Sequence, residues 1–326
     1  MMLNRRRCLK GLASIAAVTA GPRFAWSQTY PARPVRLIVP FAAGGPNDLA
    51  ARVIAQGLSD RLGKQFYVEN IAGAGGNVGT AQAARAAPDG YTVLLVAPSY
   101  AANPSLFEKV AYDPNKSFDA VTMAVTAPTI LTVHPSIEAR TVKELIELIK
   151  AQPGKFSYAS PGAGTPPHLL GELFRLSLQL DLVHVPYSSG GTAIGSTVAG
   201  HTPISFGALP PAVPHVKDGK LRAVALTSKT NTQVLPGVPT SAQAGYPDIA
   251  ADIWSAVLVP AGTPKDIVAL LQGEIGKVLK LPAVNERMAA LGYEPVANTP
   301  EECSAQIATE ITKWAKVIKD AGIKAQ

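Results

Sequence analysis

Residues 39–63, VPFAAGGPNDLAARVIAQGLSDRLG, join the end of an apolar run to the start of an amphipathic one. The apolar run, Val35–Phe41, has the length and composition of a strand. Gly44 and Gly45 end it, and Gly63 is placed as the C-cap of the helix that follows. The apolar residues of that helix share one face: Ala51, Ile54, Ala55, Leu58 and Leu62. The stretch therefore predicts a strand, a glycine loop and a helix, in that order.

This order repeats along the 326 residues, which indicates an α/β fold with largely parallel sheets flanked by helices. The chain is long enough for two lobes of ordinary domain size with a cleft between them. We place lobe 1 at residues 28–126 and 228–326, and lobe 2 at residues 127–227. The further strands that we expect are Phe66–Glu69, Tyr91–Ala97, Thr129–Val133, Phe156–Ala159, Leu182–Tyr187, Pro203–Ala208, Leu221–Thr227 and Trp254–Val259.

Capping residues mark three further helix starts. Thr141 and Glu144 have the spacing of a capping box, ahead of an apolar face that holds Val142, Leu145, Ile146 and Ile149. Thr263 and Thr299 each precede a proline, with an acidic residue at the third helical position. This pattern predicts that both threonines are N-caps of long C-terminal helices.

The first 27 residues have the pattern of an export signal, with a basic start, an apolar middle and small residues at the end. Cleavage after Ser27 makes Gln28 the expected mature N-terminus. The segment NRRRCLK, residues 4–10, resembles a twin-arginine signal with Asn and Cys in place of Ser and Phe, which leaves the general secretory route open. We therefore expect a soluble protein of the periplasm.

Removal of this signal changes the charge of the chain. Residues 1–27 hold five basic residues and no acidic one, so the formal net charge falls from +7 to +2. The remaining charge gives no support for nucleic-acid binding. Cys8 is lost with the signal, and Cys303 is left without a partner for an internal disulfide.

Four glycine-rich loops each lie between an expected strand and an expected helix, at residues 42–48, 73–77, 160–168 and 188–192. In a parallel α/β sheet such loops gather at the carboxyl ends of strands, where ligands bind. Each following helix points unpaired N–H groups and a partial positive charge at that place. A tight turn alone explains any single loop, whereas four loops favour a site for a carboxylate or another anion. The loops contain no Lys or Arg, so helix dipoles and hydroxyls would hold the anion.

Motifs for other chemistries are missing. The sequence has no G-x-S-x-G, no H-E-x-x-H and no glycine loop that ends in Gly-Lys-Ser/Thr. The histidines lack metal-ligand spacing, so we expect no metal, no cofactor and no catalytic residue. His184 is expected in the core, whereas His168 and Asp48 each have two open roles, as helix caps or as ligand contacts. Trp254 and Trp314 are expected to serve in packing, and Cys303 is expected in a C-terminal helix with no catalytic role.

Several longer motifs occur together in this chain. They include VPFAAGGPND (39–48), GLSDRLGKQFYVENIAGAGGNVGT (57–80), YASPGAGTPPHLLGELF (158–174), HVPYSSGG (184–191) and ITKWAKVIKDAGI (311–323). On these segments, over essentially the whole mature chain, the sequence resembles the substrate-binding receptors of tripartite tricarboxylate transporters, also called Bug-type receptors. The resemblance implies a periplasmic binding protein of the Venus flytrap type, whose two lobes close on a small carboxylate and then dock on membrane permease subunits.

The resemblance also implies where the ligand binds. In the family, the first two glycine loops bind a ligand carboxylate through backbone N–H groups and ordered water, and segments of the second lobe contact the rest of the ligand. Carried over by motif, the expected ligand-binding residues are Phe41, Ala43, Gly44, Gly45, Asp48, Ala74, Gly75, Gly76, Asn77, Ser99, Ser160, Thr165, His168, Tyr187 and Ala208.

The chain departs from the family pattern in three places. Ala42-Ala43 stands where the family often has Pro-Pro or Pro-Ala, and Ser188-Ser189 stands where Lys-Gly is usual. Gly207 follows Phe206 where the family often has Asp or Asn. The loss of a polar group there favours an aromatic or aliphatic acid over a tricarboxylate.

These observations favour a monomeric solute receptor, with two alternatives. An exported hydrolase acting on a carboxylate ester would need a nucleophile, a base and an orienting group that converge in the cleft. A ligand-loaded partner of a signalling sensor would share the ligand site and differ in its docking surface.

Overall fold

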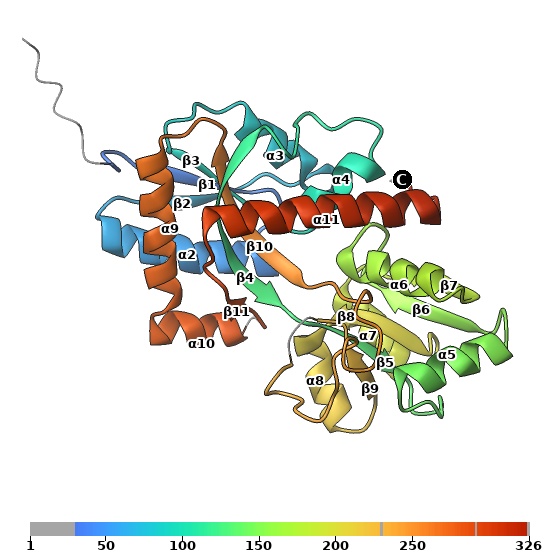
Figure 1. The fold of residues 1–326 in the computed structure, drawn as a ribbon. Coiled ribbons are helices and arrows are strands. Elements are labelled where there is room, and N and C mark those ends of the chain that lie inside the picture. The colour runs from blue at the N-terminus through green and yellow to red at the C-terminus, as the bar shows by residue number, and fades with distance from the viewer. Residues whose placement is uncertain (1–29, 229–230, 291, 325–326) are drawn as a thin grey trace, which may run out of the picture. The chain divides into compact units, whose positions relative to one another are not determined.

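The computed structural model describes residues 30–228, 231–290 and 292–324. The export signal, Cys8 and the cleavage site after Ser27 lie outside the described residues. From Arg33 onward the chain forms one compact unit, which holds two β-sheets and the helices that cover them (Figure 1). None of the described helices is both long and apolar enough to cross a membrane.

The first sheet, as far as the chain is described, has the strand order β11-β4-β10-β3-β1-β2. Strands β2, β1 and β3 pair in parallel, whereas β10 runs antiparallel to both β3 and β4. The short β11 pairs antiparallel with β4. The strands are β1 (Val35–Val39), β2 (Phe66–Asn70), β3 (Thr92–Val96), β4 (Phe118–Ala127), β10 (Ile253–Pro260) and β11 (Glu294–Pro295).

The second sheet has the order β7-β6-β8-β5-β9 within the described residues. Strands β7, β6 and β8 pair in parallel, and β5 runs antiparallel to β8 and β9. The strands are β5 (Thr129–Val133), β6 (Phe156–Ser160), β7 (Leu182–Pro186), β8 (Ile204–Ala208) and β9 (Arg222–Leu226).

The two-lobed α/β architecture is confirmed, but both sheets are mixed rather than largely parallel. The cause is the way the chain passes between them. Strand β4 leads directly into β5, and β10 returns to the first sheet. Strand β5 enters the second sheet from the first, and β10 enters the first sheet from the second. Each therefore runs antiparallel to neighbours whose carboxyl ends point toward the sheet from which it came.

Helices cover both sheets. In the first lobe α2 packs against β2 and α9, while the long α11 packs along β4 and α4 and also reaches α6 of the second lobe (Figure 1). In the second lobe α7 packs against α8 and β8. The helices are α2 (Pro46–Leu62), η1 (Ala74–Gly76), α3 (Asn77–Ala84), α4 (Ser99–Leu106), α5 (Val142–Ala151), α6 (Pro166–Ser177), α7 (Gly190–Val198), α8 (Leu209–Lys217), α9 (Lys265–Leu279), α10 (Pro282–Ala290) and α11 (Pro300–Ala321).

Local capping signals were reliable at two of the three expected positions. The Thr141 side chain accepts from the Glu144 N–H, and Thr299 forms a full capping box with Glu302. The prediction for Thr263 is wrong, because α9 begins one residue later and Thr263 donates its hydroxyl to the Pro260 carbonyl instead. The expected apolar face of α5 is buried in full.

The segments that join the lobes meet at Thr129. Its buried hydroxyl lies 2.9 Å from the Thr227 hydroxyl and 2.5 Å from the Ala251 carbonyl oxygen. Trp254, the second residue of β10, is buried in the apolar core, as expected for a packing residue. The junction is therefore tied by hydrogen bonds as well as by apolar contact.

Candidate functional site

A cavity of about 860 Å³ lies between the two lobes and takes its wall from both. The first lobe contributes residues of the loops after β1, β2 and β3 and of helix α4, and the second lobe contributes the loops after β6 and β7 and the last residue of β8. The wall consists of Phe41, Pro46, Asn47, Gly75, Ala97, Pro98, Ser99, Asn103, Leu106, Phe107, Pro161, Ala163, Gly164, Thr165, Pro166, Pro167, Ser188, Ser189, Gly190, Ala208, Ile253 and Lys324.

Five helices begin at this cavity. The first residue or the N-cap of each lies on the wall: Pro46 of α2, Ser99 of α4, Pro166 of α6, Gly190 of α7 and Ala208 before α8. A helix N-terminus presents unpaired N–H groups and a partial positive charge. The described wall contains no Asp or Glu and a single lysine. This electrostatic setting favours an anion.

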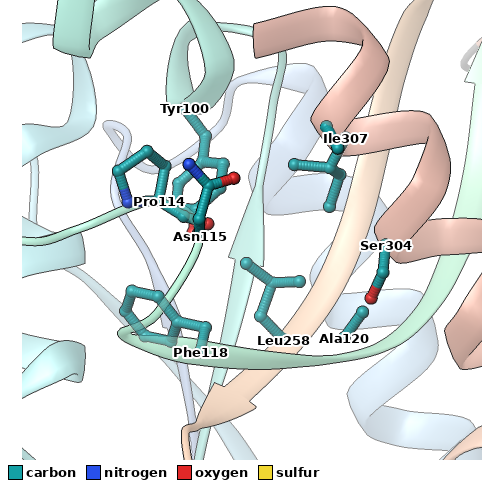
Figure 2. Close-up of a pocket in the computed structure, with 9 residues that line it drawn as sticks. Tyr100, Pro114, Asn115, Phe118, Ala120, Leu258, Ser304 and Ile307 are labelled. Carbon is teal, nitrogen blue, oxygen red and sulfur yellow. The ribbon is translucent and has the colours of Figure 1, made fainter.

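Two other hollows lie in the first lobe. The smaller, about 220 Å³, is enclosed by Tyr100, Phe118, Leu258 and the α11 residues Ser304 and Ile307 (Figure 2). The larger, about 930 Å³, adjoins it and opens between the N-terminal ends of α9 and α11. Neither is lined by a residue of the four glycine loops. The cavity between the lobes is therefore the better candidate site.

The buried side chain of Asp48 holds the first glycine loop in place. Its carboxylate accepts hydrogen bonds from the Gly44 N–H (2.8 Å), from Arg52 (3.0 Å) and from Asn70 (2.9 Å). Burial raises the pKa of Asp48, but these hydrogen bonds outweigh burial and keep the pKa below its usual value. The Gly44 N–H is thus used inside the loop, and the N-terminus of α2 faces the cavity instead.

The second glycine loop has four consecutive residues with positive φ, residues 73–76. One of them is Ala74, and a left-handed conformation costs a residue with a side chain about 1 kcal/mol. Asn103 of α4 holds the loop by donating to the Gly75 carbonyl (3.0 Å) and to the buried side chain of Asn77 (2.9 Å). The hydrogen bonds from Asn103 therefore fix the loop, and Gly75 lies on the cavity wall.

The loop after β6 rests on two histidines. The Gly164 N–H donates to His168 Nδ1 (2.9 Å), and the Ser160 hydroxyl lies 2.7 Å from His184 Nε2. The two imidazole rings stack with their centroids 4.0 Å apart. His168 is 5% exposed and Ser160 is fully buried. Both residues therefore lie beneath the loop, and Gly164 and Thr165 form the wall above them.

This histidine pair is kept neutral. Burial lowers the pKa of His168 to about 4, with a further contribution from His184, while the nearby Glu172 acts in the opposite direction. Burial also lowers the pKa of His184. The Glu172 carboxylate itself is bound by Arg175 (2.6 Å) and by the Tyr158 hydroxyl (2.7 Å), so its charge is largely compensated.

The segment after β7 contributes hydroxyls to the wall. The Tyr187 hydroxyl is engaged with Ser196 (2.5 Å) and Thr202 (2.7 Å), and the residue is not among the described wall residues. Ser188 and Ser189 do lie on the wall, and Ser189 begins α7 with a capping box. The described residues contain no cluster of His, Cys, Asp and Glu that could hold a metal ion.

Comparison with known sequences decides the family. Residues 50–323 match the tripartite tricarboxylate transporter family receptor. The chain belongs to this family.

Relatives of this receptor are known from sequence and structure. Protein BugT of Bordetella pertussis is 37% identical over 326 residues, which cover 99% of each chain. The solved structure of the periplasmic binding protein BugD is 35% identical, with a TM-score of 0.72 over 91% of this chain and 100% of that one. MatC from Rhodopseudomonas palustris, solved with bound malate, is 30% identical, with a TM-score of 0.72 over 89% of this chain and 100% of MatC.

In this receptor the residues expected from the family motifs fall into two groups. Those on the cavity wall are Phe41, Gly75, Ser99, Thr165 and Ala208. Those outside the described wall are Ala43, Gly44, Gly45, Asp48, Ala74, Gly76, Asn77, Ser160, His168 and Tyr187. Asp48, Ser160 and His168 of the second group are buried and accept hydrogen bonds from backbone N–H groups of their own loops, and the buried Asn77 side chain accepts from Asn103.

Sequence reasoning missed several wall residues of the receptor. Leu106 and Phe107 come from the end of α4, a helix that the sequence did not suggest because Pro104 lies inside it. Ile253 follows the crossing to the first sheet, and Lys324 follows α11 at the end of the chain. No local pattern marks Lys324, because its place at the cavity depends on the packing of α11.

Proposed function

We propose that this chain binds a small carboxylate between its two lobes and delivers it to membrane permease subunits of a tripartite tricarboxylate-type transporter. The observation that supports this proposal most directly is the convergence of five helix N-termini on a cavity whose described wall contains no acidic residue. Membership of a receptor family and the malate bound by MatC agree with it.

The ligand is proposed to have an apolar body. Between the helix N-termini the wall is made mainly of aliphatic, aromatic and proline side chains, among them Phe41, Leu106, Phe107 and Ile253. A hydrated polar chain would lose water against such a surface without compensation, whereas an alkyl or aryl chain would gain from burial.

Closure is proposed to couple binding to delivery. We assign residues 28–126 and 228–326 to lobe 1 and residues 127–227 to lobe 2. A ligand can favour the closed form only through contacts that the open form lacks. Such contacts are available here because the Gly164 loop of one lobe approaches Leu106 of the other, where an added Cβ would lie 3.0 Å from the leucine. We infer that the closed receptor, exported to the periplasm as a monomer, is the form recognised by the permease.

A binding role is proposed in preference to hydrolysis. The pair that most resembles a nucleophile and its base is Ser160 and His184, whose side-chain atoms lie 2.7 Å apart. Ser160 is fully buried and absent from the described cavity wall, so a substrate in the cavity would not reach its hydroxyl. A nucleophile must approach the reacting atom closely.

A thermal-shift screen of residues 28–326 tests the function. After extensive dialysis, the protein is mixed with monocarboxylates, dicarboxylates, tricarboxylates and aromatic acids. A ligand at 100 times its Kd should stabilise the folded state by about 2.7 kcal/mol, which raises the Tm by a few degrees at this chain length. No shift with any acid, together with no carboxylate released from denatured protein in mass spectrometry, would reject the proposal.

A further inference from the structure

The C-terminal end of α11 is built to place one more residue at the cavity. Helix α11 packs against α4 of the first lobe and α6 of the second (Figure 1). Gly322, with φ of 64°, ends the helix and donates its N–H to the Lys319 carbonyl, while Ile323 donates to the Ile318 carbonyl (3.0 Å). These two bonds form a Schellman motif. Ile323 packs against the apolar cluster that contains Ile318, a contact that often accompanies this motif.

This motif sets the direction of the next residue, Lys324, which is exposed and lies on the cavity wall. Lys324 is the one charged side chain among the described wall residues. No described carboxylate forms an ion pair with it. Lys324 therefore brings to the cavity wall a positive charge that no described carboxylate compensates.

Lys324 and the amide groups of the first two glycine loops come to the cavity from different elements. Those loops follow β1 and β2, and α11 approaches between α4 and α6. The cavity, at about 860 Å³, has room for far more than one carboxylate group. Leu106 and Phe107 at the end of α4 add apolar wall.

We propose that Lys324 binds the second carboxylate of an elongated dicarboxylate and selects such ligands over monocarboxylates of the same length. The inference rests on the carboxylate-binding function proposed above. One carboxylate lies at the N–H groups of the glycine loops, the carbon chain lies against the apolar wall, and the far carboxylate pairs with the lysine. The flexible lysine side chain can follow ligands of different length, which a rigid bidentate arginine would restrict.

The test compares the affinities of adipate and hexanoate, and of succinate and butyrate, by calorimetry on residues 28–326 and on Lys324→Gln. At about 150 mM salt, charges more than about 8 Å apart are largely screened, so the comparison reports a close contact. Lys324→Gln should weaken the preferred dicarboxylate about tenfold and leave the matched monocarboxylate unchanged within about twofold. Lys319→Gln removes the same charge five residues earlier in the chain, outside the described wall, and should change neither affinity. Lys324→Arg should restore part of the preference.

The outcomes separate this inference from the function on which it rests. If the unaltered protein binds none of the four acids and no other carboxylate, the proposed function fails and the role of Lys324 fails with it. If the unaltered protein binds a carboxylate but Lys324→Gln weakens both members of a pair equally, or neither, only the role of Lys324 is overturned. A preference of the unaltered protein for the monocarboxylates would also overturn it.

Discussion

The backbone N–H of Gly164 donates a 2.9 Å hydrogen bond to Nδ1 of His168, so the second-lobe wall of the cavity depends on a neutral, buried imidazole. Protonation of Nδ1 would place two donors against each other. It would also put a charge beside the stacked ring of His184. The loop that carries Gly164 and Thr165 is thereby linked to the protonation state of a side chain beneath it.

Acidification should destabilise the folded state between pH 6.5 and about 4. The His168 pKa is about 4 in the fold and about 6.5 in the unfolded chain, so between these values the unfolded chain binds more protons. The stability from this group is complete above pH 6.5, declines as the pH falls, and is lost below about 4. The expected loss is on the order of 3 kcal/mol, measurable by urea unfolding at several pH values.

The His168→Asn variant identifies the source of this pH dependence. Its amide oxygen can accept from Gly164 and does not titrate, so the slope between pH 6.5 and 4 should become shallower, with a remainder from His184. His201→Asn, which removes an exposed histidine, should keep the original slope. A slope unchanged in His168→Asn would assign the pH dependence to other groups.

Asp48→Ala should destabilise the fold by about 2–4 kcal/mol, because it leaves Gly44, Arg52 and Asn70 without their acceptor. Asp48→Asn keeps an acceptor and should cost less. Asp60→Ala, at an exposed carboxylate of the same helix, is the matched control and should stay within about 0.5 kcal/mol. Denaturant unfolding measures all three. A large loss of ligand affinity at full stability in Asp48→Ala would instead make Asp48 a direct ligand contact.

Helix caps and buried helix faces could be predicted from the sequence because they depend on residues close together in the chain. The capping box at Thr299 and the buried face of α5 follow from side chains a few residues apart, and both are confirmed. Helix α4 escaped prediction because SYAANPSL contains Pro104 and offers no helical period. It forms because Tyr100 stacks on Tyr112 and Asn103 bonds to the second glycine loop. Tertiary contacts here override local preference.

Some residues of the candidate site could likewise be located from local sequence, whereas others depend on tertiary packing. Strand-loop-helix order locates the glycine loops, and Gly75 and Thr165 of these loops do lie on the cavity wall. The sequence could not distinguish residues on the cavity wall from buried residues that hydrogen-bond to the loops. For this reason the role of His168 was left open between a ligand contact and a helix cap. Lys324 could not be found at all, because it is more than 100 residues from the nearest glycine loop and reaches the cavity through the packing of α11.

Gly45→Val should abolish or strongly weaken ligand binding while leaving the fold intact. Gly45 has extended φ and ψ, which any residue adopts, and an added Cβ would meet only the Ala42 carbonyl oxygen at 3.5 Å. The valine branches would stand in front of the first-turn N–H groups of α2. We expect a loss of affinity of at least about tenfold with stability within about 1 kcal/mol. Gly237→Val, at an equally open position outside the described wall, should bind normally.

Gly75→Ala and Gly63→Ala form a matched pair that separates backbone strain from ligand binding. Both glycines are left-handed, with φ of 64° and 66°, so each alanine should cost about 1 kcal/mol of stability. A Cβ at Gly63 meets nothing within 4 Å, whereas at Gly75 it lies 3.3 Å from the Asn103 side chain and on the cavity wall. Gly75→Ala should therefore also lower ligand affinity, and Gly63→Ala should not. Thermal unfolding and calorimetry on both variants give the comparison, and equal affinities would exclude the second glycine loop from the binding site.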